Sequence, residues 1–390
     1  MLQRVFIVLL ILLILPDVYL FFRYIIPKIK NKWWRAIYWL PTLLLTVGLL
    51  YLVYFGDQTL VVEHARIVGW FAIFFFVVVA PKLVLALFAL LGTPFHKWLH
   101  WPRTPFTAVG VALATLIAFV VLYGSFIGRT RLEIKQATYT SPRLPQGFDG
   151  YRIVVLSDIH IGSWVGNEQF VQRMVDVANE QHPDLIVFTG DLVNHRAIEL
   201  NGFEQILAGL KAKDGVYSIL GNHDYGTYFH WPNKQAEADN LKDLERREAD
   251  MGWKLLNNDH AILRHTGDSI ALIGVENDGE PPFSQHADLP QAVQGTEGMF
   301  RILLSHNPTH WRREVLPKSD IDLMLAGHTH AMQLEIGSYS PSKYVYPEWG
   351  GFYYKGERAL YVNVGIGYIG LPFRFGAWPE ITVLTLNKKR

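Results

Sequence analysis

The stretch LMLAGHTHAM, Leu323–Met332, passes from an apolar run into two histidines that are one residue apart. The run Leu323–Gly327 has the length and composition of a strand buried on both faces, and a glycine ends it. His328 and His330 follow directly. Two interpretations are open at this point: the imidazoles bind a ligand, or polar residues simply resume where the strand ends. The rest of the chain decides between them.

Short apolar runs of the same kind recur through the second half of the chain. They are Arg152–Ser157, Leu185–Gly190, Val216–Gly221, Ile270–Val275, Arg301–Ser305, Ala359–Gly365 and Ile381–Leu386. Segments with a helical period, such as Phe170–Gln181 and Gln235–Met251, lie between several of these runs. Strands that alternate with helices predict an α/β domain with a mostly parallel or mixed sheet.

Polar residues able to bind a metal or transfer a proton follow five of these strands. In chain order they are Asp158 and His160, Asp191, Asn222 with His223 and Asp224, His306, and His328 with His330. In open α/β sheets, ligands bind at the carboxyl ends of the strands. We therefore expect the strand ends to bring these side chains together although they lie far apart in the sequence.

The residue types suit a metal centre. Carboxylate, amide and imidazole donors favour Mn²⁺, Fe²⁺ or Zn²⁺ over Ca²⁺, which prefers oxygen alone. Two such ions about 3.5–4 Å apart can hold a hydroxide, polarise a phosphate and stabilise the attacking and leaving oxygens. The candidate metal ligands are Asp158, His160, Asp191, Asn222, His306, His328 and His330. His223 adjoins Asn222 and is instead a candidate general acid that donates a proton to the leaving alkoxide.

Each motif is weak on its own. A G-H-x-H sequence arises by chance in about one chain of this composition in twenty, and an Asp after a strand usually caps a turn or a helix. The ordered set, with each member directly after a strand, favours the metal site. Other histidines, such as His195 and His310, lack that placement and are interpreted as surface or structural residues.

The ordered set D-x-H, G-D, G-N-H-D, H and G-H-x-H, across Arg152–His330, resembles the calcineurin-like metallophosphoesterases. The segment Tyr361–Leu386 is similar to the carboxy-terminal part of their bacterial YkuE-like branch. The resemblance implies a β-sandwich flanked by helices, with a two-metal site. It implies one ion on Asp158, His160 and His330, a second on Asn222, His306 and His328, Asp191 as the bridge and His223 as the acid. Ala331 departs from the pattern, because relatives often have glycine there.

The first part of the chain is predicted to span a membrane. Four apolar runs, each about long enough to cross a hydrocarbon core of roughly 30 Å, are Val5–Ile26, Ala36–Phe55, Ile67–Leu91 and Phe106–Ile127. The first run lacks a small-residue cleavage site and leads into three more, so it is interpreted as a span rather than a signal peptide. The predicted organisation is a four-helix transmembrane region over 1–128, a linker and entry strand over 129–150, and the metallophosphoesterase domain over 151–390.

Loop charges predict the orientation of the spans. The second loop carries two acidic residues and one basic residue, Asp57, Glu63 and Arg66. The other two loops are basic: the first carries Arg23, Lys28, Lys30, Lys32 and Arg35, and the third carries Lys97 and Arg103. The positive-inside rule then places the first and third loops in the cytoplasm and the catalytic domain outside.

Two charged residues lie within the apolar runs. Asp17 is near the middle of the first run, and Lys82 lies at a similar depth in the third. Charges at bilayer depth usually face the bundle interior and are often paired. We expect Asp17 and Lys82 to pair, the alternative being that each snorkels or faces a polar cavity alone.

The whole sequence predicts a membrane-anchored, metal-dependent phosphoesterase acting on a phosphodiester or pyrophosphate bond. Lipid-linked phosphates are the leading substrates, because aromatic residues gather after the motifs, as in Tyr339–Tyr346, and can form an apolar rim. The alternatives are a transporter or sensor regulated by the attached phosphoesterase domain, and a binding module without turnover. The net charge of +1 gives no basic footprint for nucleic acid. Arg374 is interpreted as a structural residue in preference to a phosphate ligand.

Overall fold

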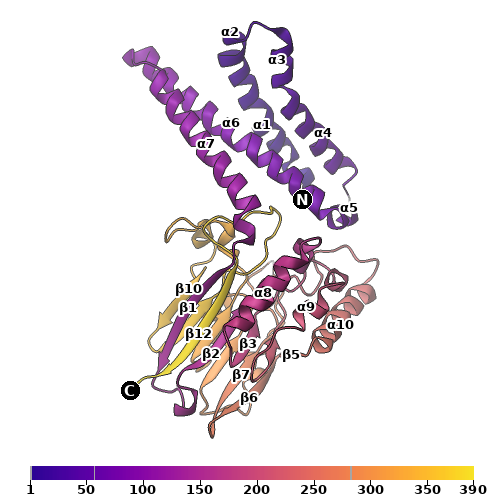
Figure 1. Ribbon diagram of the computed structural model, residues 1–390, viewed down its shortest axis with the longest axis vertical. Helices are drawn as coiled ribbons and strands as arrows, with labels where there is room; N and C mark the ends of the chain where they lie inside the picture. Colours follow the sequence, from indigo (N-terminus) through magenta and orange to yellow (C-terminus); the bar gives the residue numbers. More distant parts are fainter. Residues whose placement is uncertain (1, 57, 282) are drawn as a thin grey trace. The chain divides into compact units, whose positions relative to one another are not determined.

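The computed structural model describes residues 2–56, 58–281 and 283–390, and it divides the chain into two compact units (Figure 1). The membrane unit comprises Met1–Ile127 with Gly370–Phe373, and the catalytic unit comprises Gly128–Ile369 with Arg374–Arg390. Asp57, which contributes to the predicted charge of the second loop, lies outside the described residues.

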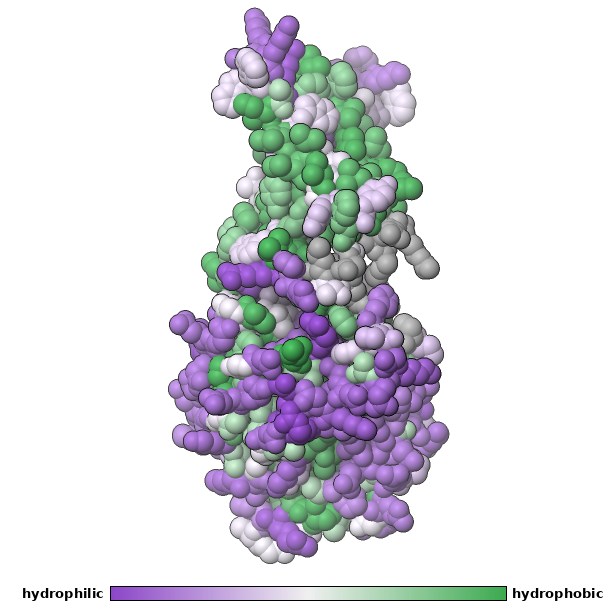
Figure 2. All heavy atoms as spheres, turned by 90° about the vertical axis from the view of Figure 1, so that its right-hand side faces the viewer, coloured by the Kyte–Doolittle hydropathy of each residue, from purple (hydrophilic) through white to green (hydrophobic). Residues whose placement is uncertain are grey.

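Within the described residues, the membrane unit contains four helical segments that are long and apolar enough to cross a membrane. They are Phe6–Lys28, Lys32–Tyr54, Ala65–Leu99 and Thr104–Thr130. Their elements are α1 (Leu2–Leu20), a π-turn (Phe21–Ile25), α2 (Ile26–Lys28), α3 (Lys32–Tyr38), α4 (Leu40–Tyr54), α6 (Ala65–Leu99) and α7 (Thr104–Phe126), with the short α5 (Gln58–Glu63) before α6. Figure 2 shows mostly hydrophobic side chains on the visible surface of these helices, as expected of helices that face lipid. The predicted four-helix transmembrane region is confirmed.

A charged pair joins α1 to α6 inside the membrane unit. The Asp17 side chain is fully buried, and its Oδ1 lies 2.8 Å from Lys82 Nζ. The Tyr38 hydroxyl donates to Asp17 Oδ1 at 2.9 Å, and the Thr42 hydroxyl donates to Oδ2. The predicted pairing is therefore confirmed, and hydroxyls from α3 and α4 complete the solvation of the carboxylate.

Reversing one charge of this pair is expected to lower the amount of protein in the membrane. Asp17→Lys or Lys82→Asp leaves two like charges together in the bundle, and breaking a buried pair typically costs about 3–5 kcal/mol. The double variant restores the pair with opposite polarity and should recover much of the loss. Quantifying a fluorescent fusion by size-exclusion chromatography measures this, with the charge reversal Lys211→Asp at an exposed position of the catalytic unit as a control. A double variant as poor as the worse single variant would contradict the prediction.

The described part of the catalytic unit contains two six-stranded mixed sheets. The first has the order β1-β12-β2-β3-β4-β5 and the second β10-β11-β9-β8-β7-β6. The strands of the first are β1 (Glu133–Ser141), β12 (Glu380–Lys388), β2 (Tyr151–Leu156), β3 (Leu185–Phe188), β4 (Val216–Ser218) and β5 (Trp253–Leu255). Those of the second are β10 (Gly351–Lys355), β11 (Arg358–Val362), β9 (Leu323–Ala326), β8 (Arg301–Leu304), β7 (Asp268–Gly274) and β6 (Asp259–His265).

The sheets pack face to face, and helices cover them. In β2, Ile153 and Val155 point into the core between the sheets, whereas Val154 and Leu156 point outward into a second core with α8 (Glu168–Glu180). Helix α10 (Lys234–Asp250) contributes Leu244 to that second core. Both faces of a central strand are thus buried, which explains the continuous apolar runs. The predicted β-sandwich flanked by helices is confirmed.

The apolar-run pattern does not indicate β5, β6 and β10. These strands carry exposed or half-buried side chains at most positions, because each lies at or near the edge of its sheet. A strand with one solvent-exposed face lacks the continuous run of hydrophobic residues that the central strands have.

Strand directions place the ends of the central strands at one edge of the sandwich. Strands β2, β3 and β4 are parallel to one another, as are β7, β8 and β9. We call the edge at which these strands end the carboxyl edge. Strand β12 is antiparallel to β2 and parallel to β1, so β1 also begins at this edge. The chain therefore enters the catalytic unit at its carboxyl edge.

Candidate metal centre

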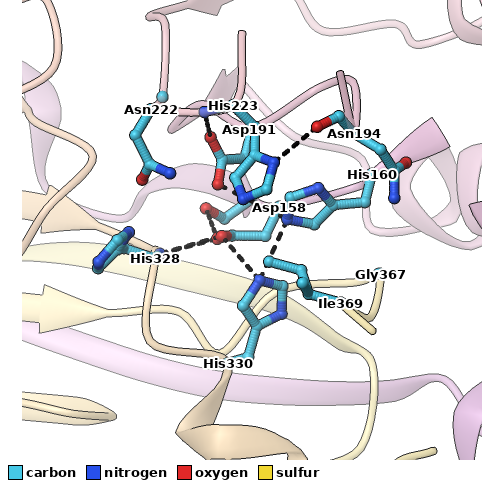
Figure 3. Close-up of polar contacts among 12 residues, drawn as sticks. Asp158, His160, Asp191, Asn194, Asn222, His223, His328, His330, Gly367 and Ile369 are labelled. Carbon is cyan, nitrogen blue, oxygen red and sulfur yellow. Dashed lines mark hydrogen bonds and ion pairs between the residues drawn. The ribbon is translucent and has the colours of Figure 1, made fainter. Parts of the chain in front are cut away.

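The carboxyl edge gathers the polar side chains that follow the strands (Figure 3). Asp158 and His160 come from the loop after β2, Asp191 from the loop after β3, Asn222 and His223 from the loop after β4, His306 from the loop after β8, and His328 and His330 from the loop after β9. The structure thus brings all the candidate site residues to one place, as their strand-end positions predict.

Asp158, His160 and His330 form the first group of donors. Their ligand atoms lie within 4.8 Å of one another, and all three side chains are buried. The Nε2 atoms of His160 and His330 are 3.2 Å apart, and His330 Nε2 lies 3.3 Å from Asp158 Oδ1. Two imidazoles and a carboxylate that converge on one point are a typical divalent-metal donor set.

Asp191, His306 and His328 form the second group. His306 Nε2 lies 3.2 Å from Asp191 Oδ2 and 3.3 Å from His328 Nδ1. The carbonyl of Thr189 can only accept a hydrogen bond, so His306 Nδ1, 2.8 Å away, donates and leaves Nε2 as the ligand atom.

Asn222 adds an amide oxygen beside the second group. Its Nδ2 donates to the Tyr228 hydroxyl at 3.0 Å, so its orientation is set. Its Oδ1 is buried and, among the residues that the structure describes, has no hydrogen-bond partner. A buried acceptor without a partner is costly, and a bound cation satisfies it.

Asp191 faces both groups with the same oxygen. Its Oδ2 lies 3.2 Å from His306 Nε2 and 3.6 Å from His160 Nε2. Its other oxygen, Oδ1, accepts the backbone N–H of His223 at 2.8 Å, which fixes the orientation of the carboxylate. This is the position that a ligand shared by two ions would take.

The electrostatics of the groups suit cations. Burial lowers the pKa of His328 to about 3 and holds the pKa of His160 and His330 well below the ordinary range, so these imidazoles are neutral. At His306, burial opposes protonation but the Asp191 carboxylate dominates and raises the pKa to about 9. A carboxylate that stabilises a proton on a neighbouring ring can equally stabilise a metal ion on that ring.

Several of these residues have strained backbones. Asp158, His160, Asp191, His328 and His330 all have a positive φ, between 47° and 74°, although none is glycine. Strain of this kind collects at functional sites and persists only where the surrounding structure enforces it.

Two positions next to the histidines show why glycine is suited to this loop. A side chain on Gly327 would collide with Ser157 and Asp158. Ala331 has a φ of 48°, which glycine adopts without strain. Ala331 therefore adopts a backbone conformation that favours glycine, the residue that relatives often have at this position.

His223 lies at the edge of the metal groups. Its Nδ1 is 2.7 Å from the backbone carbonyl of Asn194, so Nδ1 donates and Nε2 is left for other partners. Its ring centroid is 4.8 Å from that of His160 and 4.5 Å from that of Tyr228.

The sequence motifs do not predict the hydrogen bonds that hold the loops around the candidate ligands. Asp224 is fully buried and accepts the backbone N–H groups of Asp191, Leu192 and Gly221, so it ties the loops after β3 and β4 together. The G-N-H-D motif contains Asp224, but the motif does not show what its carboxylate binds.

Two residues beyond the motifs touch the histidines of the loop after β9. The Tyr346 hydroxyl lies 2.9 Å from His328 Nε2. Arg374 is fully buried, donates to the carbonyls of Gly367 and Ala377, and has a guanidinium nitrogen 3.0 Å from His330 Nδ1. These contacts agree with a structural role for Arg374, although its partners are carbonyls rather than a carboxylate.

A third set of metal-type donors, Asp278, His310 and Glu314, lies outside this centre. The Arg313 guanidinium is paired with Asp278 and already supplies the cation there. We assign no metal to this set.

A helix-flanked β-sandwich with carboxylates, an amide and imidazoles gathered at its carboxyl edge defines the class of this protein as a metallophosphoesterase. Comparisons with known proteins agree. Residues 151–332 match the family described as Calcineurin-like phosphoesterase, and residues 3–129 match the family described as Probable Calcineurin-like phosphoesterase, transmembrane domain.

Curated relatives match more than two thirds of the chain. The chain is 33% identical over 290 residues to a "Transmembrane protein with metallophosphoesterase domain" of Danio rerio, covering 71% of this chain and 62% of that protein. It is 31% identical over 282 residues to the uncharacterized metallophosphoesterase YkuE of Bacillus subtilis, covering 68% of this chain and 89% of that protein. The chain thus spans less than two thirds of the Danio rerio protein and most of YkuE. It belongs to the calcineurin-like phosphoesterase family and is a multi-pass membrane protein.

Proposed function

We propose that this protein is a membrane-anchored hydrolase that cleaves a phosphodiester or pyrophosphate bond with the help of two divalent metal ions. The observation that carries the proposal is the position of Asp191. One oxygen of this carboxylate faces the first donor group through His160 and the second through His306. A single-ion site would not need a carboxylate placed between two sets of imidazoles.

The donors divide naturally between the two ions. Asp158, His160 and His330 would hold one ion, Asn222, His306 and His328 the other, and Asp191 both. Nitrogen and oxygen donors of this kind suit Mn²⁺, Fe²⁺ or Zn²⁺. Bound ions would activate a water molecule as the nucleophile and offset the charge that develops on the phosphoryl group.

His223 is the residue best placed to protonate the leaving group. In its imidazolium form, Nδ1–H donates to the Asn194 carbonyl, which holds the ring, and Nε2–H remains for transfer. The backbone N–H of His223 is bonded to Asp191 Oδ1, so the acid and the shared ligand are positioned by one contact.

The membrane unit supports two further parts of the proposal. Four spans tether the catalytic unit to a membrane, which favours a lipid-linked phosphate as substrate. The charges of the first and third loops favour a catalytic unit outside the cytoplasm.

A second candidate function is a transporter or sensor that the phosphoesterase unit regulates. The buried Asp17–Lys82 pair favours it, because charged residues inside a membrane are expensive and are often functional.

Metal depletion tests the proposed reaction. The full chain, stripped with a chelator, is expected to lose hydrolysis of bis(p-nitrophenyl) phosphate and to regain it with Mn²⁺, with two ions bound per chain by elemental analysis. Ca²⁺ is the matched control and should not restore turnover, since it prefers oxygen donors alone. Undiminished turnover by metal-free protein would overturn the proposal.

A further inference from the structure

The carboxyl edge carries a group of exposed apolar side chains, which we call the apolar lip. Its members are Met332, Ile336, Tyr339, Tyr344, Val345 and Ile369. Tyr344 is 75% exposed and Ile336 is 63% exposed. On soluble proteins, large apolar side chains are usually at least partly buried, and exposed ones rarely gather in one patch. A concentration of them at one place indicates a surface that meets something apolar.

The lip is one connected surface built from two loops. The rings of Tyr339 and Tyr344 lie 6.3 Å apart, and Ile336 pairs with Tyr339 in a short bridge. The backbone N–H of Ile369 donates to Gln333 Oε1 at 2.6 Å, which joins the loop after β11 to the loop after β9 beside Met332.

The lip borders the metal centre. Met332 follows the candidate ligand His330 by two residues, and Val345 precedes Tyr346, whose hydroxyl contacts His328. A molecule held against the lip would therefore lie next to the donor groups.

Chain connectivity indicates which apolar phase the lip meets. The last membrane-spanning helix, α7, ends at Phe126, and the catalytic unit begins at Gly128. Arg129 donates to the Tyr368 hydroxyl at 3.2 Å, and Tyr368 adjoins Ile369 of the lip. Only Ile127 separates α7 from the catalytic unit, and Arg129 already contacts the residue next to Ile369, so the lip is closely linked through the chain to the last membrane-spanning helix.

The composition of the lip suits a lipid interface. Lys343 Nζ lies 4.4 Å from the Tyr339 ring centroid and 5.2 Å from that of Tyr344. Tyrosines flanked by a lysine are typical of the headgroup region, where aromatic rings meet both water and acyl chains and the ammonium meets lipid phosphate.

We infer that the apolar lip inserts into the lipid interface and that an amphiphilic phosphate ester reaches the metal centre from the lipid phase. The part that concerns the substrate rests on the proposed function, whereas the insertion of the lip does not.

A quenching experiment tests the insertion directly. Because the chain has no cysteine, Tyr344→Cys creates a single labelling site in the full-length protein. The protein is labelled with an environment-sensitive fluorophore and placed in nanodiscs of phosphatidylcholine and phosphatidylglycerol, with or without spin-labelled lipid. Arg264→Cys is the matched control, since Arg264 is exposed and pairs with Ser269 at the opposite edge of the second sheet.

The label at position 344 is expected to lose about half of its emission to spin-labelled lipid, because an inserted side chain lies about 5–10 Å deep, while the label at 264 keeps its emission. Equal emission at both positions would overturn the inference. A label at 344 that is shielded from aqueous iodide, yet unaffected by lipid quencher, would also overturn it and would indicate a protein partner or a second copy of the chain.

A turnover comparison tests the substrate part. The double variant Ile336→Ser/Tyr344→Ser is expected to lower the ratio of activity on a nanodisc-borne aryl phosphodiester to activity on bis(p-nitrophenyl) phosphate by about tenfold. An unchanged ratio would contradict delivery from the lipid phase. If the wild-type protein hydrolyses neither substrate, the proposed function fails, and the quenching result still decides whether the lip inserts.

Discussion

Asp191→Asn is expected to abolish turnover and to lower the metal content of the purified protein. Asparagine keeps the shape of the side chain and the bond from the His223 backbone, but it removes the charge that faces His160 and His306 together. In the proposed two-ion site, both ions would lose charge compensation at once, so we expect kcat/KM to fall by about a thousandfold or more. Steady-state kinetics with elemental analysis of the same preparation measures both effects.

Asp278→Asn is the matched control for this change. Asp278 is also a buried aspartate, and its Oδ2 lies 3.3 Å from His310 Nε2, but it belongs to the donor set that Arg313 neutralises. This variant is expected to lose some stability through the broken ion pair and to keep its metal and its turnover. If purified Asp191→Asn kept two ions and near-normal turnover, the two-metal assignment would be wrong.

His223→Ala is expected to leave the metal content intact and to reduce turnover according to the leaving group. General acid catalysis typically contributes about 10²–10⁴-fold, and a substrate with an alkoxide leaving group should lose a factor in that range. A nitrophenyl ester should lose much less, since nitrophenolate leaves without a proton. Parallel kinetics on the two substrates, with metal analysis, gives the comparison.

His195→Ala is the control for His223→Ala, because it removes a neighbouring imidazole ring without removing the proposed general acid. The His195 ring centroid lies 6.1 Å from that of His223, but burial lowers the pKa of His195 to about 4, so at neutral pH it is not the imidazolium form that acts as a general acid. This variant should affect both substrates little. Equal losses on both substrates in His223→Ala would count against the general-acid role.

Much of the architecture could be predicted because its signals are local. A run of about 20 apolar residues suits a membrane-spanning helix wherever it occurs, and a short continuous apolar run suits a strand covered on both faces, as Val154 and Val155 show in β2. The edge strands β5, β6 and β10 carry no such signal, since one face of each is not fully buried. Their pairing depends on neighbours that are distant in the chain.

The candidate site was likewise predictable from the sequence only in part. The sequence by itself determined which donor types follow each strand and the depth of Asp17 and Lys82 in their spans, because residue identity and spacing are properties of the chain. Only the tertiary structure decided that one oxygen of Asp191 faces both donor groups, that the Asn194 carbonyl holds His223, and that Asp224 ties the loops together. The apolar lip likewise became visible only through exposure. The physical reason is that distances, hydrogen-bond directions and burial arise from the packing of segments far apart in sequence, and spacing along one chain does not specify how those segments meet.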